Sequence, residues 1–533
     1  MKISTEMVAM SDGIQLATDV YLPGDGSYPV VMAMTPYGRQ QMRPLAQPVV
    51  SRGYALVVQD VRGRYDSEGE FNPIEQERQD GPETVAWLGQ QPWFDAESGI
   101  GMLGLSYLGE VALLLAARCP EVKAIIDVGA MADFWDVSHR GGALVLHHSL
   151  PWTIITSRSP QPSLRHQDWA QVYATRPLVE AASAAGHDNQ RWRSWVEHEV
   201  KDAYWERWSI RADLPAVKVP ILHFSGWYDI CLGSTLDLYN SLSASAGQPH
   251  RLILGPWTHN GVLISKPELL GVDFGSESSS RAPERILAWF DYWLKGEANG
   301  ALSEPTVQAF LTGSNRWVSG SAWPLPNSSK RRFYLGDGSL MATPPGQDLR
   351  VSFVSDPAKP IPTIGGSVWE FQVAGLDPGP ADQAVLSQRP DVVVFETETL
   401  DCNLDLVGPV RCTIFGELDT ETADWVCRLV DVAPDGTRRW VADGIVRAHL
   451  HSGTAAIRPV SPGKVEEYQV DLWATGHTFR PGHRLALEVS GSSFPKWSLN
   501  LHSLDGADPV VARQTIHTGP EYPSYLEVFT LEE

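Results

Sequence analysis

A serine lies in a pattern that is typical of a catalytic nucleophile. Ser106 lies in a segment of the G-x-S-x-G type at residues 104–109 (GLSYLG), in which one extra residue, Leu108, precedes the second glycine; an apolar run at residues 100–105 comes before it and an apolar helical segment at residues 110–118 comes after it. Between a strand and a helix, this motif makes a sharp turn that lifts the serine hydroxyl above the sheet. We therefore predict that Ser106 is a nucleophile for acyl transfer. The alternative is a structural serine in an ordinary tight turn.

A serine hydroxyl needs a base to take its proton and a carboxylate to orient that base. In chains with this motif, the acid and then the histidine follow the serine. Asp229 comes just after an apolar run at residues 219–224, and His259 comes just after another at residues 251–254. Both lie beyond the ends of predicted strands, where open parallel sheets gather reactive groups. An isolated Asp in a turn is more often structural, but the order and positions together predict the triad Ser106, Asp229 and His259.

Acyl transfer also needs hydrogen-bond donors for the oxygen that becomes negatively charged. The backbone N–H of Tyr107, which follows the predicted nucleophile, is expected to be one donor. A second is expected in the loop at residues 35–39, which follows the apolar run at residues 30–34, and the phenol of Tyr37 is the candidate. Simple packing of an aromatic side chain is the alternative for Tyr37.

The elements that position these residues can be inferred from the hydrophobic pattern. In the first third, short apolar runs alternate with amphipathic stretches, which is typical of a parallel sheet wrapped by helices. A helical segment rich in Trp, His and Arg follows, and then the strand pattern returns. Many short strands with Gly, Pro and Asp turns end the chain and predict a sandwich or jelly roll. The predicted ranges are 1–132 and 214–312 for the sheet domain, 133–213 for a helical cap, and 313–533 for the β domain.

Composition excludes several classes of partner. The 533 residues include 64 Asp and Glu against 42 Lys and Arg, a net charge of −22. This excess repels phosphate backbones and anionic lipids, so we expect neither nucleic acid nor a membrane as a partner. No run approaches the roughly 18 apolar residues of a membrane span, and Glu6, Asp12 and Asp19 interrupt the N-terminal segment where a secretion signal would be apolar. We expect a cytoplasmic protein.

The cysteines and histidines do not predict a metal. Five cysteines, an odd number without a C-x-x-C pair, argue against a disulfide framework and against a zinc site, and buried free thiols are expected instead. The adjacent His147 and His148 suggest a metal site, but no carboxylate or cysteine lies near them at ligand spacing. We therefore expect no metal and no cofactor.

The order of these motifs resembles that of a known family. The chain is similar, nearly end to end, to the bacterial cocaine-esterase group of the X-Pro dipeptidyl-peptidase family of serine hydrolases, which also includes α-amino acid ester hydrolases. The matching segments are residues 35–37, 60–64, 67–71, 104–109, 226–229, 255–259, 289–296, 379–383, 443–447, 481–484 and 493–496. The resemblance implies an α/β-hydrolase fold with an inserted helical cap and a C-terminal β jelly-roll domain over the site. It also implies that Ser106 is the nucleophile, His259 the base, Asp229 its orienting acid, and Tyr37 with the Tyr107 amide the oxyanion hole.

The same resemblance suggests substrate-binding residues. Enzymes of the cocaine-esterase group carry an aromatic residue two positions after the catalytic Asp, where this chain has Cys231. They also tend to have Trp near the cap position where this chain has His139. A second Trp of that group is retained in this chain as Trp152. We therefore expect an acyl pocket that is wider or more polar than in that group.

Three functions remain open from the sequence. The first is a carboxylesterase for a small, aromatic or apolar acyl group. The second is an X-Pro dipeptidyl aminopeptidase or an α-amino acid ester hydrolase or acylase. It would need a carboxylate for a free amine, which Asp133 or Asp136 can supply unless they are merely solvated. The third is a carbohydrate-binding protein with a vestigial triad, which 20 Trp residues would suit. A small-molecule ester or amide is the expected partner, and a homodimer is left open.

Overall fold

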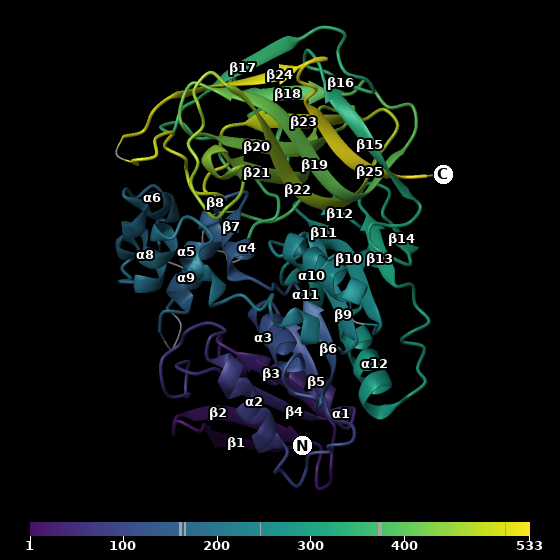
Figure 1. The fold of residues 1–533 in the computed structure, drawn as a ribbon. Coiled ribbons are helices and arrows are strands. Elements are labelled where there is room, and N and C mark those ends of the chain that lie inside the picture. The colour runs from purple at the N-terminus through teal and green to yellow at the C-terminus, as the bar shows by residue number, and fades with distance from the viewer. Residues whose placement is uncertain (159–161, 165–166, 246, 371–375, 507, 533) are drawn as a thin grey trace.

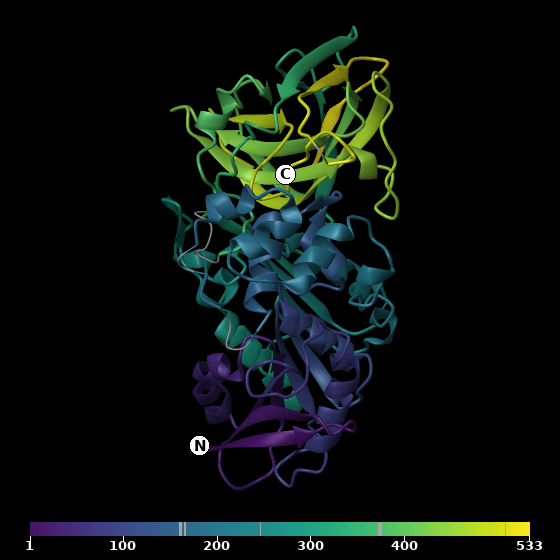
Figure 2. The same cartoon turned by 90° about the vertical axis from the view of Figure 1, so that its left-hand side faces the viewer.

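The computed structural model describes residues 1–158, 162–164, 167–245, 247–370, 376–506 and 508–532. The N-terminal strands lie at one end of the molecule and the C-terminal β domain lies at the other (Figures 1 and 2). The cap helices lie between these ends, next to the β domain. Among the described residues, no helix combines the length and the apolar character needed to cross a membrane.

A ten-stranded sheet forms the first domain. Its strands, in spatial order, are β1 (Lys2–Ala9), β2 (Gln15–Leu22), β4 (Ala55–Asp60), β3 (Val30–Thr35), β5 (Ile100–Leu105), β6 (Val122–Val128), β9 (Ile221–Tyr228), β10 (His250–Thr258), β13 (Val307–Leu311) and β14 (Arg316–Gly320). The strands from β4 to β13 are parallel, and the pairs at the two edges are antiparallel. Parallel strands of this kind end at one common edge, where loops can gather reactive groups.

Helices cover both faces of this sheet. They are α1 (Ala46–Ser51), α2 (Glu77–Leu88), α3 (Tyr107–Ala116), α10 (Leu232–Ser245), α11 (Gly261–Ile264) and α12 (Ala282–Lys295). Alternate residues of β3 pack on opposite sides: Met32 and Met34 belong to the core that includes α2 and α3, whereas Val31 belongs to the core that includes α1 and α12. Burial on both faces explains why the strands are continuous apolar runs. The predicted α/β-hydrolase fold is confirmed.

The cap is helical and is built around tryptophans. Its elements are α4 (Phe134–Ser138), β7 (His139–Arg140), β8 (Ala143–Leu144), α5 (Leu146–Ile155), α6 (Trp169–Tyr173), α7 (Ala181–Ala184), α8 (Gln190–Glu197) and α9 (Ala203–Glu206). The Phe134 ring lies 5.2 Å from the Trp152 ring and 5.9 Å from the Trp208 ring, and the Trp152 and Trp195 rings are stacked at 5.6 Å. The many tryptophans of this segment therefore form its core.

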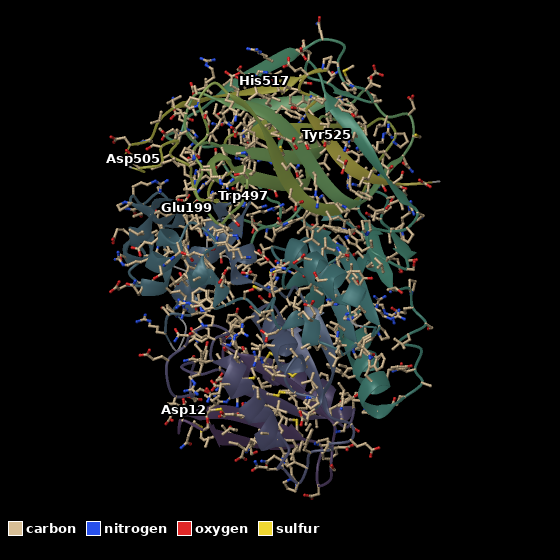
Figure 3. The ribbon with its side chains drawn as sticks, in the orientation of Figure 1. Asp12, Glu199, Trp497, Asp505, His517 and Tyr525 are labelled. Atoms are coloured by element: carbon tan, nitrogen blue, oxygen red, sulfur yellow. The ribbon has the colours of Figure 1, made fainter. Side chains whose placement is uncertain are left out.

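The C-terminal domain is an antiparallel sandwich. One sheet contains β15 (Ser328–Leu335), β16 (Leu340–Met341), β17 (Leu349–Ser355), β19 (Leu404–Leu418), β22 (Val465–Phe479), β24 (Ala512–Thr518) and β25 (Tyr525–Leu531), and the other contains β18 (Val392–Glu396), β20 (Asp424–Val432), β21 (Arg438–Arg447) and β23 (Arg484–Ser490). Inward-facing residues of both sheets share one core. Figure 3 shows Glu199 at the boundary between the cap and this domain. The Nε2 atom of His449, from the β domain, lies 3.0 Å from a carboxylate oxygen of Glu199.

Two details differ from the pattern of the sequence. Strand β14 lies beyond the predicted domain boundary at residue 312, yet it pairs with β13 and so extends the first sheet. Strands β9 and β10 run on to Tyr228 and Thr258, through residues that resemble turns in the sequence. Gly226 is needed there because a Cβ atom would clash with the Trp257 backbone of the neighbouring strand. Such close backbone approach is a common reason for glycine within a strand.

Candidate active site

The predicted nucleophile occupies a strained turn between β5 and α3. Ser106 has φ 56° and ψ −124°, a conformation that non-glycine residues rarely adopt. Its N–H donates to the Val128 carbonyl of the adjacent β6 at 2.9 Å, which ties the turn to the sheet. The motif glycines are needed because a Cβ atom on Gly104 would clash with the backbone of Gly109. Ser106 is half-buried, at the edge of the sheet where its hydroxyl can meet a substrate.

The predicted acid and base meet because their strands are neighbours. Asp229 directly follows β9 and His259 directly follows β10, and the last residues of these two parallel strands are paired. The Nδ1 atom of His259 lies 2.8 Å from an Asp229 carboxylate oxygen. The same carboxylate accepts from the Cys231 N–H at 2.8 Å and from the Ser225 hydroxyl at 2.9 Å. Three groups therefore fix the carboxylate, and an imidazole that donates its Nδ1 proton to Asp229 carries its lone pair on Nε2.

The electrostatics of this pair suit a base. Both side chains are buried, with 0% of Asp229 and 4% of His259 exposed. Burial lowers the pKa of His259, but the Asp229 carboxylate and the Cys231 side chain together outweigh burial, so this pKa is raised well above its usual value. The carboxylate therefore stabilises the imidazolium that would form when the ring accepts a proton.

Tyr37 and Trp152 lie together beside the serine. Tyr37 follows β3, and the Trp152 indole of α5 donates to its phenol oxygen at 3.1 Å. The Ser106 hydroxyl also hydrogen-bonds to this phenol. Burial raises the pKa of Tyr37 to about 12, so the phenol keeps its proton at neutral pH. Arg64 joins the two segments, since its guanidinium donates to the Pro36 carbonyl at 2.7 Å and to the Ile155 carbonyl at 3.1 Å.

Tyr107 is held from below by a buried carboxyl group that was not evident in the sequence. Its backbone N–H is at the start of α3 and so has no acceptor within the helix. Its phenol accepts from the Ile74 N–H at 3.1 Å and donates to Glu77. Burial raises the pKa of Glu77 to about 7, although its hydrogen bond from Tyr107 opposes that shift. Glu77 begins the polar helix α2, where nothing in the pattern distinguishes it from a solvated residue.

Gly129 is a second residue of the site that the sequence did not reveal. It follows β6, the strand between those that carry Ser106 and Asp229, and has φ +63°. A Cβ atom there would lie 2.9 Å from an Asp229 carboxylate oxygen and 2.9 Å from the His259 ring. Glycine therefore leaves the space that the acid and base occupy.

The three predicted substrate-binding residues are not all near one another. Trp152 lies against Tyr37, and the Cys231 side chain lies beside His259. His139 instead stacks on the Trp135 ring, with the ring centroids 3.8 Å apart, and lines a cavity of about 860 Å³ between the cap and the β domain. Burial lowers the pKa of His139 to about 3, so this ring is neutral.

The cap carboxylates considered for a substrate amine already have cationic partners. Asp133 lies 2.6 Å from the Lys201 ammonium and 3.5 Å from the Arg211 guanidinium, and Asp136 pairs with the same two side chains. Glu370 is a different carboxylate, within the β domain between β17 and β18. One of its oxygens accepts from the Asn260 N–H at 3.0 Å, whereas the other is buried without a hydrogen-bond partner among the described residues. Burial raises the pKa of Glu370, and the nearby His259 opposes this shift.

This fold and this arrangement of side chains define a serine hydrolase that acts on ester or peptide bonds. Residues 12–261 match the sequence model of the X-Pro dipeptidyl-peptidase (S15) family, and residues 299–527 match that of the X-Pro dipeptidyl-peptidase C-terminal non-catalytic domain. The chain belongs to this family. The family assignment favours an enzyme over the carbohydrate-binding alternative.

Individual relatives extend the similarity over the whole chain. Cocaine esterase of Rhodococcus sp. (strain MB1 Bresler) is 31% identical over 98% of this chain and 97% of its own. Among solved structures, an α-amino acid ester hydrolase is 25% identical with a TM-score of 0.88, covering 99% of this chain and 96% of its own. An aminopeptidase from a marine sediment Thaumarchaeota archaeon, 24% identical with a TM-score of 0.89 over 100% of this chain and 96% of its own, shares the fold.

Proposed function

We propose that the protein is a carboxylesterase that hydrolyses a small ester through an acyl-enzyme on Ser106. The observation that carries the proposal is the hydrogen bond between His259 Nδ1 and Asp229 at the ends of two neighbouring strands, with the strained Ser106 turn at the same edge of the sheet. A carboxylate that fixes the imidazole tautomer, and a serine raised on an elbow, are the parts that acyl transfer requires.

In the proposed reaction, the Ser106 hydroxyl attacks the ester carbonyl while His259 Nε2 takes its proton. The carbonyl electron pair moves onto oxygen, which accepts hydrogen bonds from the Tyr37 phenol and the Tyr107 N–H. When the intermediate collapses, the alkoxide leaves and takes the proton from His259. Water then repeats the sequence on the acyl-enzyme, and Ser106 regains its proton as the acid is released.

The surroundings support an aromatic or apolar acyl group. Trp152 beside Tyr37 presents an aromatic surface, and it is stacked on Trp195. Cys231 is smaller than the aromatic residue expected there from the related enzymes, which supports a wider pocket on the side of His259. We therefore expect benzoate esters to be accepted as well as acetate esters.

The test is hydrolysis of p-nitrophenyl esters, from acetate to benzoate, by the wild type and by Ser106→Ala. Removing the nucleophile is expected to lower kcat by about 10⁴-fold or more. Ser27→Ala is the matched control, because Ser27 is an exposed loop serine, and it is expected to keep wild-type activity. Activity that survives in Ser106→Ala would refute the assignment.

A second candidate, an α-amino acid ester hydrolase or an aminopeptidase, is favoured by Glu370. A buried carboxylate oxygen without a partner is costly unless a ligand supplies a donor. A substrate ammonium beside His259 would be such a donor. The cap carboxylates Asp133 and Asp136 are less suited, because Lys201 and Arg211 already neutralise them.

Paired substrates separate the two candidates. The rates are measured for an amino acid p-nitrophenyl ester with a free amine, for its N-acetyl form, and for an X-Pro p-nitroanilide. If the second candidate is right, Glu370→Gln lowers kcat/KM for the free-amine ester by about 10- to 100-fold and leaves the N-acetyl ester nearly unchanged. Glu268→Gln, at an exposed glutamate, is the control. Equal effects of Glu370→Gln on both esters would leave only the carboxylesterase.

A further inference from the structure

Three side chains of metal-binding type converge at the turn before α10. Asp229, Cys231 and His259 each place one ligand atom within 4.8 Å of the ligand atoms of the other two. All three are buried, and only 1% of Cys231 is exposed. Among the described residues, no other three Asp, Glu, His or Cys side chains come together this closely.

The proposed reaction gives the thiol of this cluster no step. Asp229 orients the base and His259 moves the proton, whereas Cys231 is brought to them by the turn after β9. Its backbone N–H donates to Asp229 at 2.8 Å, and its carbonyl accepts from the Thr235 N–H at 2.9 Å in the first turn of α10. The backbone of Cys231 is therefore held on both sides, and its sulfur lies beside His259.

The donor set suits a soft divalent cation. Carboxylate, imidazole and thiolate together are typical ligands of Zn²⁺, with bonds of roughly 2.0–2.3 Å. Ligand atoms around such an ion lie about 3–4 Å apart, so the present cluster needs only small side-chain movements. A thiolate disfavours Mg²⁺ and Ca²⁺, which prefer oxygen ligands.

The charge around the cluster also favours a cation. Glu370 lies close enough to interact with His259 and Asp229, and one of its oxygens is buried without a hydrogen-bond partner among the described residues. Two carboxyl groups and one thiol therefore face a single imidazole. Ser106 is half-buried at the same edge of the sheet as the cluster.

We propose that Asp229, Cys231 and His259 form a Zn²⁺ site whose occupation reversibly inhibits the enzyme. The ion takes the place of the Nδ1 proton between Asp229 and His259, and the neutral imidazole keeps that proton on Nε2 instead. The Cys231 thiol releases one proton to solvent as it becomes a ligand. No electrons are transferred. Nε2 then has no lone pair for the Ser106 proton, so His259 can no longer act as the base. The predicted inhibition rests on the proposed function, whereas the predicted binding of Zn²⁺ does not.

Binding is tested without any activity, on the full-length Ser106→Ala protein. Cd²⁺ is titrated and the ultraviolet charge-transfer absorption of a Cd²⁺–thiolate bond is recorded. We expect an absorption signal that saturates at one Cd²⁺ ion per protein. The double variant Ser106→Ala/Cys231→Ser should lack this signal. Cys402→Ser is the matched control, because Cys402 is an exposed thiol elsewhere in the chain, and it keeps the signal. A signal that persists without the Cys231 thiol, or that Cys402→Ser removes, overturns the proposal.

Inhibition is tested on the active protein with Zn²⁺, and each variant is compared with its own uninhibited rate. Zn²⁺ is expected to inhibit the wild type, EDTA to restore its activity, and Ca²⁺ and Mg²⁺ to have no effect. Cys231→Ser should raise the inhibition constant by about tenfold or more. If the inhibition constant of Cys231→Ser equals that of the wild type, the proposal is overturned. If the wild type has no esterase activity, the proposed function is contradicted, and the Cd²⁺ titration still tests the metal site.

Discussion

Replacing Tyr37 with Phe removes one hydroxyl and leaves the aromatic ring in place. In the wild type, the phenol oxygen accepts the Trp152 N–H at 3.1 Å, so its own proton is free to be donated toward a substrate oxygen. Burial raises the pKa of this phenol to about 12, which keeps the proton in place throughout the neutral range. The substitution therefore removes one of the two proposed donors to the oxyanion.

The expected cost follows from what such a donor contributes. Loss of one oxyanion-hole donor lowers kcat by about 10²–10³-fold, or roughly 2.7–4 kcal/mol of transition-state stabilisation. The bond forms fully only as charge develops on the oxygen, so kcat should fall much more than KM rises. The Trp152 indole also loses its acceptor, and leaving a buried donor unpaired costs about 1–3 kcal/mol of folding stability.

The assay is steady-state hydrolysis of p-nitrophenyl acetate, together with urea unfolding of each variant. Tyr28→Phe is the control, because the Tyr28 hydroxyl donates only to the Asp25 carbonyl in an exposed loop. The control should keep its kcat. A Tyr37→Phe enzyme that is fully folded and retains kcat within about threefold of wild type would refute the role of Tyr37, since even a weak oxyanion donor contributes more.

Three further substitutions probe the site. Asp229→Asn should lower kcat by about 10⁴-fold. It should also move the acid limb of the kcat/KM profile to lower pH, because the carboxylate that raises the pKa of His259 is gone. A pH series with p-nitrophenyl acetate measures both effects. Gly129→Ala should lower kcat by displacing the acid and base, whereas Gly13→Ala, also at positive φ but with open space around it, should cost only stability. Glu77→Gln should lower stability by about 1–3 kcal/mol in urea unfolding and reduce kcat more than it changes KM.

Each of these has a result that contradicts it. In the wild type, activity should be lost as the pH falls through the His259 pKa, because the protonated ring cannot accept the serine proton. If the acid limb of the kcat/KM profile is unchanged in Asp229→Asn, that limb does not report the titration of His259. Equal kcat values for Gly129→Ala and Gly13→Ala would contradict the steric argument. A Glu77→Gln protein with normal kcat would show that its contact with the phenol next to the nucleophile is purely structural.

Much of the fold could be predicted because its signals are local. A strand, the turn GLSYLG and an apolar helix follow one another around Ser106, and the structure has this order in β5 and α3. The helical cap and the antiparallel β domain were also evident from local patterns. The ends of β9 and β10 were not, because Gly226 and the Gly255–Thr258 irregularity resemble turns in the sequence and become strand only through their neighbours.

The site could be predicted only where its residues follow a strand or a motif. Asp229 and His259 do so, and their mutual distance is set by strand pairing. Gly129, Glu77 and Glu370 depend instead on which distant segments approach the site. Glu370 comes 111 residues after His259 (370 − 259), within the β domain between β17 and β18, and no periodicity connects the two.

Buried carboxyl groups near the nucleophile illustrate this limit most clearly. Glu110 lies in the first turn of α3, is 0% exposed, and has no hydrogen-bond partner for either carboxyl oxygen among the described residues. A glutamate in such a sequence would ordinarily be expected at the surface. Burial, reinforced by Asp133 and Glu77, raises its pKa well above the usual value and so disfavours its charged form. The charge state of the residues beneath the nucleophile is therefore determined by the tertiary fold, whereas the nucleophile itself is determined by six consecutive residues.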